Sequence, residues 1–299
     1  MPFFGPLSCW NRKASEFKKH PDSANIVKEL VRTSIIACPN INISNFSFPV
    51  YKVPNSVPKV PVRLVKRTKT ATGYTYADVP TWDKPNTRKL LAAGVRLKTT
   101  MKPAAGSDGH LIVANTDESS AVGLWRAQYI GGKWQCEGAG FVDDYVNGTG
   151  IVKQFSTGEW VGERATGLSG LGGLITRAEV QAGVIPHGLA IALLGPKKGW
   201  PVKPAIQSDG GSLAAYAPRE GQRLRLPSGY SSTTTIPLLK MIERAASDYS
   251  LIVTDKAGCH AFFCEDPMTA GGDYKAWQGG KYAYQIGAAF PWAKLEAVQ

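Results

Sequence analysis

Two histidines lie at or within apolar runs that are typical of strands. His110 follows the turn Ser107-Asp108-Gly109 and precedes the apolar run Leu-Ile-Val-Ala, and His187 lies within the apolar stretch 183–194. An imidazole transfers protons readily near neutral pH. We therefore predict both as acid or base catalysts, as in a polysaccharide lyase that removes the proton beside a uronate carboxylate. The alternative is that both are core residues hydrogen-bonded to the backbone.

A lyase also needs groups that hold the carboxylate of its substrate, because the charge of that carboxylate opposes the formation of a carbanion. Arginine supplies the neutralising charge, tyrosine can act as a base, and tryptophan stacks on sugar rings. The residues that we expect to bind substrate in these ways are Arg164, Arg177, Tyr145, Tyr249 and Trp125.

Two Ser-Asp-Gly turns offer a second kind of chemistry. Asp108 and Asp209 occupy the same place in the two turns, and glycoside hydrolysis requires a pair of carboxyl groups. The turns would also suit Ca²⁺, or they are simply favourable turn sequences. No HxH, HxxxH or HExxH spacing supports a metal site built from His110, His187 and Asp209. We therefore predict no metal and no other cofactor, with Ca²⁺ as the alternative.

The charge of the chain favours an anionic partner. It has 299 residues, with 35 Lys and Arg against 23 Asp and Glu, for a formal charge of +12. The summed field of such a surface attracts polyanions, whether a uronic-acid polymer, a nucleic acid or an acidic protein. The basic residues form only short runs, and no nucleic-acid-binding module is recognisable. We expect an anionic polysaccharide or other polyanion rather than nucleic acid.

The five cysteines and the first ten residues indicate where the protein is made and in what state its thiols are. The cysteines, among them Cys38, form no CxxC pair, so we expect buried thiols and no zinc site. The segment 1–10 has no basic region followed by an apolar run, so we expect no signal peptide. No stretch approaches the roughly 20 apolar residues of a membrane span. We predict cytoplasmic synthesis, no membrane partner, and release or assembly into a phage particle.

Glycine and proline punctuate the chain in the manner of many strands and turns. Its 32 glycines and 20 prolines separate short apolar runs. Helices are predicted over 21–33, from the capping box at Thr176 to Gly183, and from Pro237. Further predictions are a hairpin at 131–132, a strand over 185–194 and pairing of 251–253 with 261–263.

These elements predict a mostly β fold, an antiparallel β-sandwich of jelly-roll type with two or three short helices. The apolar content of 43% is ample for one large core. We predict a single β-sandwich domain over residues 1–299, whose extended N-terminal segment, residues 1–94, wraps the core.

Several sequence blocks occur in an order that resembles a known family. The blocks are Ser8–Asn11, His20–Ala24, Gly106–His110, Ala165–Ile175, Gly183–Ala190, Ser208–Gly210 and Glu220–Leu224. They resemble an uncharacterised family of bacterial proteins, common in actinobacteria and usually secreted, with blocks such as SPWN, SDGH, GLIRPEE, IDHAL and SDG. The resemblance spans about residues 8–260 and implies no particular activity.

This chain departs from the family pattern at two places. The aspartate that precedes the second histidine of the family is Pro186 here, which weakens a catalytic role for His187. The secretion signal of the family is missing, which favours a phage or intracellular context. We predict a carbohydrate-active or carbohydrate-binding protein for an anionic polysaccharide, either a lyase or a glycosidase. The alternative is a structural or attachment protein of a phage particle, without catalysis and in contact with other particle subunits.

Overall fold

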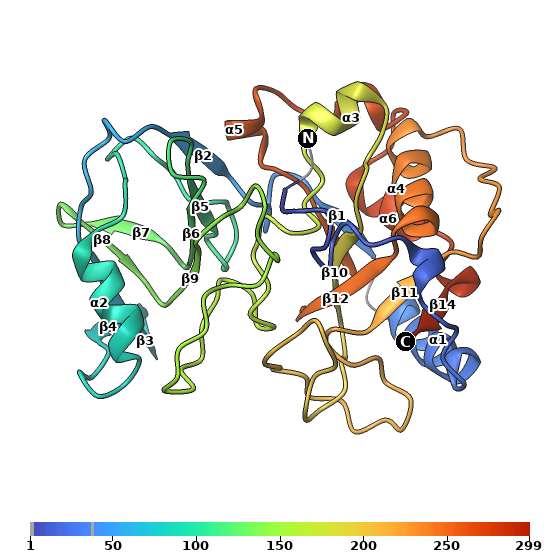
Figure 1. Cartoon of the computed structure of the whole chain (residues 1–299), viewed down its shortest axis with the longest axis horizontal. Coiled ribbons are helices and arrows are strands. Elements are labelled where there is room, and N and C mark those ends of the chain that lie inside the picture. Colours follow the sequence, from blue (N-terminus) through green and yellow to red (C-terminus); the bar gives the residue numbers. More distant parts are fainter. Residues whose placement is uncertain (1–2, 37–38) are drawn as a thin grey trace.

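The structure is a computed structural model that describes residues 3–36 and 39–299; the predictions for Cys38 and for the first two residues lie outside this part. The described residues form fourteen strands and six α-helices. Two lobes lie side by side (Figure 1), a small lobe of residues 50–142 and a large lobe that holds both ends of the chain. The prediction of a β-rich protein is therefore confirmed.

A mixed six-stranded sheet forms the centre of the large lobe. In spatial order its strands are β1 (Asn40–Asn42), β13 (Ala261–Phe263), β10 (Leu189–Leu193), β12 (Leu251–Lys256), β11 (Arg223–Arg225) and β14 (Glu296–Val298). Strand β10 is parallel to β12, and β1 is parallel to β13, whereas the remaining pairs are antiparallel. All five residues of β10 are buried, as in strands covered on both faces.

Helices and short 3₁₀ turns of the large lobe lie around this sheet (Figure 1). They are η1 (Ala14–Glu16), α1 (Ser23–Ile36), α3 (Arg177–Ala182), α4 (Pro237–Asp248), α5 (Pro267–Ala270), η2 (Lys275–Trp277), α6 (Ala283–Ala289) and η3 (Trp292–Lys294). Helix α4 buries Leu238, Ile242 and Ala245, whose spacing makes one apolar face. The capping box predicted for α3 is confirmed, because the Thr176 side chain accepts the Glu179 N–H and the Glu179 carboxylate accepts the Thr176 N–H.

Two four-stranded sheets build the small lobe. One has the order β2 (Val50–Val53), β5 (Leu111–Asn115), β6 (Ala121–Trp125), β9 (Gly138–Val142). The other has the order β4 (Gly73–Asp78), β3 (Val62–Thr70), β8 (Lys133–Cys136), β7 (Gln128–Ile130). Helix α2 (Pro85–Ala93) packs on β3. The predicted hairpin is confirmed, since Gly131 and Gly132 join β7 to β8 with positive φ angles of 57° and 77°.

The predicted antiparallel arrangement is wrong, because the sheets are mixed and curl as a half-barrel; a jelly-roll sandwich is not confirmed. The predicted pairing of 251–253 with 261–263 is also wrong, since β10 lies between these strands. The connection from β10 to β12 includes helix α4, and such a crossover allows the two strands to run parallel. Six helices, not two or three, occur in the described residues.

The two lobes share a buried apolar cluster. Ile112 of the small lobe packs in this cluster with Phe48, Ala190, Ile252 and Phe263 of the large lobe. This contact places the carboxyl end of β12 beside the loops of the small lobe. No helix within the described ranges is long and apolar enough to cross a bilayer.

Candidate active site

Several charged side chains meet where β10 and β12 end. Asp255 lies near the end of β12, and a register shift between Ile191 and Ala192 sets Ala192 opposite it. The carboxyl ends of parallel strands are the usual place for ligands in α/β sheets. Asp108 and Asp209 lie close enough to act electrostatically on the Asp255 carboxyl. We call Asp255, Asp209, Asp108 and Glu220 the carboxyl cluster.

Arg164 lies beneath Asp255 and is completely buried. Its Nη1 is 3.6 Å from Asp255 Oδ2 and donates to Thr254 Oγ1 at 2.8 Å. The guanidinium also lies over the rings of Phe48 and Phe263, at 4.6 and 4.4 Å from their centroids. Its Nε has no hydrogen-bond partner among the described residues. A buried cation without full hydrogen bonding is costly, so Arg164 needs a negative charge nearby, which the carboxyl of Asp255 or of Glu163 can supply.

Asp255 combines a buried environment with a route to solvent. The pKa of its carboxyl is raised to about 7, chiefly by burial. Arg164 and a 2.9 Å hydrogen bond from the Ala165 N–H oppose the rise, whereas the charges of Asp209 and Asp108 add to it. The side chain nevertheless retains 22% of its exposure. Asp255 can therefore hold a proton near neutral pH and present it to a ligand.

Glu220 and Asp209 continue the carboxyl cluster from the interior to the surface. Glu220 is fully buried, and its Oε2 accepts the Asp209 backbone N–H at 3.0 Å. Burial raises the pKa of Glu220, and the neighbouring Asp209 and Asp255 raise it further. Its Oε1 is without a partner in the described part of the chain. Asp209 is exposed, and Lys256 Nζ donates to its backbone carbonyl at 3.4 Å.

The two Ser-Asp-Gly turns hold their aspartates by different means. At Gly210 a Cβ would lie 2.2 Å from the Lys197 carbonyl oxygen, so only glycine allows this close approach. The Asp108 carbonyl instead accepts the Arg126 N–H at 2.8 Å, which fastens that turn to the small lobe. The site is thus assembled from both lobes.

The two predicted histidines are not brought together as a catalytic pair. His110 precedes β5, stacks on Phe48 at 4.1 Å and is buried. Burial, with the charge of Arg164, lowers its pKa to about 3. His187 precedes β10 instead of lying within it, and its Nε2 is 3.0 Å from Glu179 Oε1. Its Nδ1 contacts the Gly188 carbonyl at 2.9 Å, so His187 ties helix α3 to the start of β10.

The other predicted substrate-binding residues have contacts elsewhere. Arg177 donates to the Asp273 carbonyl at 3.1 Å, Tyr145 packs against Phe3, and Lys13 lies 3.8 Å above the Tyr249 ring. Trp125 lies 3.8 Å beneath the Arg126 guanidinium. Of the predicted residues, those assembled around Asp255 are Arg164, Asp108, Asp209 and, through Phe48, His110.

Sequence reasoning missed Asp255, Glu220 and Glu163. A detectable signal existed for Asp255, since it directly follows the apolar run Leu-Ile-Val-Thr at the end of a strand. Glu163 had no such signal. Its carboxyl is enclosed by Gly123 and Gly140, where a Cβ would lie 2.3 and 2.1 Å from it, and burial raises its pKa.

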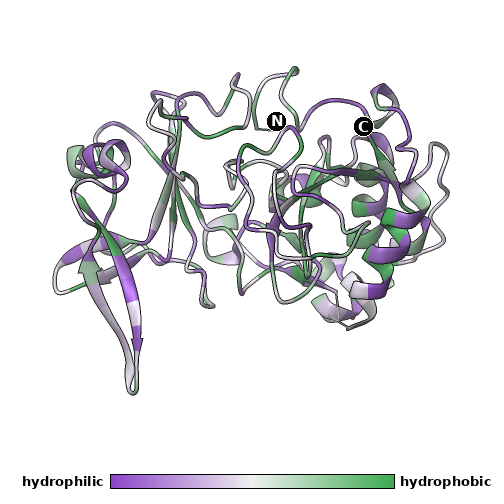
Figure 2. Ribbon diagram, turned by 90° about the horizontal axis from the view of Figure 1, so that it is seen from below, coloured by the Kyte–Doolittle hydropathy of each residue, from purple (hydrophilic) through white to green (hydrophobic). Residues whose placement is uncertain are grey.

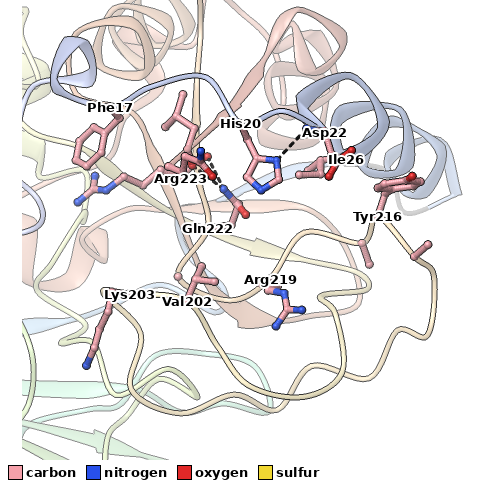
Figure 3. Close-up of a pocket in the computed structure, with 15 residues that line it drawn as sticks. Phe17, His20, Asp22, Ile26, Val202, Lys203, Tyr216, Arg219, Gln222 and Arg223 are labelled. Atoms are coloured by element: carbon pink, nitrogen blue, oxygen red, sulfur yellow. Dashed lines mark hydrogen bonds between the residues drawn. The ribbon is translucent and has the colours of Figure 1, made fainter.

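A separate cavity of about 510 Å³ lies between the N-terminal segment and the loop before β11 (Figure 3). The Asp22 N–H donates to His20 Nδ1 at 3.0 Å, so the proton of the neutral ring is on Nε2. In Figure 3 the side chains of Lys203 and Arg223 extend away from its centre. We take the carboxyl cluster as the candidate site, because carboxyl groups with raised pKa values are concentrated at functional sites and the Asp255 side chain keeps 22% of its exposure.

No metal centre is evident among residues 3–36 and 39–299, which contain no group of three or more His, Cys, Asp or Glu arranged to hold an ion. The prediction for Ca²⁺ at the two turns stays a prediction. Comparison of the chain with protein-family models, with curated proteins and with solved structures finds no match. The family resemblance of the sequence blocks likewise stays a prediction.

Proposed function

We propose that this protein is a glycoside hydrolase that acts on an anionic carbohydrate. The observation that carries the proposal is Asp255, whose pKa burial raises to about 7 while its side chain stays 22% exposed. A carboxylic acid that keeps its proton near neutral pH can protonate the oxygen of a glycosidic bond. Asp209, which is exposed at the surface end of the carboxyl cluster, supplies the second carboxyl that the reaction requires.

The formal charge of +12 on the whole chain favours an anionic substrate. Lys256 Nζ lies at the Asp209 loop, where it can reach a ligand. Arg164 is completely buried, so it is a positioning residue that holds Asp255. A substrate with a carboxylate, sulfate or phosphate group would complement the basic chain.

Hydrolysis is favoured over the lyase reaction by the state of the histidines. A lyase needs a strong base, but an imidazole with a pKa of about 3, as at His110, is a weak one. His187 is held by Glu179 and the Gly188 carbonyl. The carboxyl cluster therefore offers the better catalytic groups.

The test is a screen against carboxylated, sulfated and phosphorylated glycosides that measures both new reducing ends and the absorbance of unsaturated products. We expect reducing ends without the absorbance. Asp255→Asn should lower the rate by at least about 100-fold, the usual effect of losing a general acid. The matched control is Asp248→Asn, at the exposed end of α4. Unsaturated products, or full activity in Asp255→Asn, would contradict the proposal.

A further inference from the structure

The outer face of the β4-β3-β8-β7 sheet carries polar side chains, interrupted on β3 by the buried Val65. Alternate residues of a strand share one face, and the register sets Arg67 opposite Tyr76 and Lys69 opposite Tyr74. On the other face of the same strands, Val62 and Leu64 are buried. We call the polar side the outer face, defined by Arg63, Arg67, Lys69, Tyr74, Tyr76 and Gln128.

The outer face has more positive than negative charge. Arg63 pairs with Asp78, whereas Arg67 and Arg126 share a single carboxylate, that of Glu137. The imbalance extends to the whole small lobe, since residues 50–142 contain 14 Lys and Arg against 6 Asp and Glu, a formal charge of +8 out of the +12 of the chain. The surface therefore complements a polyanion.

The outer face also presents rings and amides. Tyr74 is 47% exposed, and the Arg67 guanidinium lies 4.4 Å from its ring centroid. Gln128 Nε2 donates to the Tyr76 hydroxyl at 3.0 Å, and Gln135 Nε2 donates to Gln128 Oε1 at 3.1 Å. Amphipathic rings beside amide and hydroxyl groups provide both the stacking surface and the hydrogen bonds that a sugar chain needs.

Arg126 connects the outer face to the candidate active site. Its backbone N–H donates to the Asp108 carbonyl at 2.8 Å, and its Nη1 donates to Glu137 at 2.9 Å. Glu137 in turn contacts Arg67 of the outer face at 3.2 Å. From there a long hairpin, β3 with β4, reaches out of the small lobe (Figure 2). The nine residues of β3 span about 30 Å.

We propose that the outer face binds an extended anionic glycan chain and delivers it across Arg126 to Asp255. The choice of a glycan over another polyanion rests on the proposed hydrolase function. Tyr74 stacks against a sugar ring, and Arg67 and Lys69 hold the acidic groups of the chain. A polymer would thus gain contacts that a short oligosaccharide at Asp255 lacks.

The experiment measures the binding of polygalacturonate to the full chain carrying Asp255→Asn, so that cleavage does not interfere. Adding Lys69→Glu or Tyr74→Ala should raise the dissociation constant by about tenfold each. The matched control is Lys66→Glu, which makes the same charge change on the opposite face of β3; it should stay within about twofold. Circular dichroism verifies the fold of each variant.

Three results would overturn the outer-face proposal. The first is unchanged polygalacturonate binding by both outer-face variants. The second is a loss of affinity in Lys66→Glu equal to that in the outer-face variants. The third is a DNA duplex that binds more tightly than polygalacturonate and whose binding the outer-face variants abolish. Hydrolysis by the wild-type protein is measured in parallel. If the wild type binds the polymer through the outer face but cleaves no glycoside, the hydrolase proposal fails alone. If it cleaves glycosides while the variants bind normally, the outer-face proposal fails alone.

Discussion

Replacing Asp255 by asparagine should abolish activity and at the same time stabilise the protein at alkaline pH. Burial raises the pKa of Asp255 from its ordinary value of 3.8 to about 7. The folded state therefore binds a proton that the unfolded state releases between these values. The stability associated with this proton is fully present below pH 3.8 and is lost as the pH rises through 7. Asparagine resembles the protonated acid and escapes this loss.

The magnitude follows from the pKa difference of about three units. At about 1.4 kcal/mol per unit, the free energy of unfolding of the variant should exceed that of the wild type by up to about 4 kcal/mol at pH 8. This figure is an upper bound, because the side chain retains 22% of its exposure. The gain should fall to about 1.6 kcal/mol at pH 5 and almost vanish at pH 3.

Thermal unfolding of both proteins between pH 3 and pH 8 measures this difference. For a chain of this size about 1 kcal/mol corresponds to roughly 2 °C in Tm, so the variant should melt up to about 8 °C higher at pH 8. Asp248→Asn should show no such trend, because that aspartate lies at the exposed end of α4. A difference that stays constant or shrinks with rising pH would refute the raised pKa and, with it, the role of Asp255 as acid.

Three further predictions concern neighbouring groups. Activity of the wild type should fall above about pH 7, where Asp255 loses its proton. In Arg164→Met this fall in activity should occur at a higher pH, because Arg164 lowers the pKa of Asp255. A pH–rate profile in which the fall does not move to higher pH would contradict the electrostatic link. Glu179→Gln should cost about 3 kcal/mol near pH 6. Burial lowers the pKa of His187 and raises that of Glu179. Their mutual hydrogen bond, the attraction of their charges and the hydrogen bonds with Thr176 and Gly188 together outweigh burial, so the pKa of His187 is raised and that of Glu179 is lowered. The stabilisation by the pair is therefore lost as the pH rises above about 6.5 and as it falls below about 4.5, and urea unfolding that shows an equal cost at pH 8 would argue against the ion pair. Gly210→Ala should displace the Asp209 loop and lower activity at least tenfold, because its Cβ would lie 2.2 Å from the Lys197 carbonyl oxygen. The control Gly258→Ala adds a Cβ in open space and should leave the rate unchanged.

Local features were predictable because short-range rules decide them. The capping box of Thr176 and Glu179 and the Gly131-Gly132 hairpin depend only on neighbouring residues. The position of β10 was not predictable in the same way. Its buried run is compatible with a parallel or an antiparallel partner, and only the crossover through α4 decides between them.

The site shows the same division between local and tertiary information. Asp108 and Asp209 were recognisable because each lies in a Ser-Asp-Gly turn, yet about 100 residues separate them in the chain. Their common neighbour Asp255 became visible only in the structure. His187 was misleading because its block resembles a family motif, whereas its contacts show that it ties α3 to β10.

Burial of Arg164 explains why acid chemistry is available at this place. A fully buried guanidinium needs a negative charge beside it, and the nearest carboxyls are those of Asp255 and Glu163. One ionised carboxyl is enough to balance one cation. Burial raises the pKa of Glu163, of Glu220 and of Asp255, so ionising all of them together is unfavourable. At least one therefore keeps its proton near neutral pH, and of the three only Asp255 has a side chain that solvent can reach.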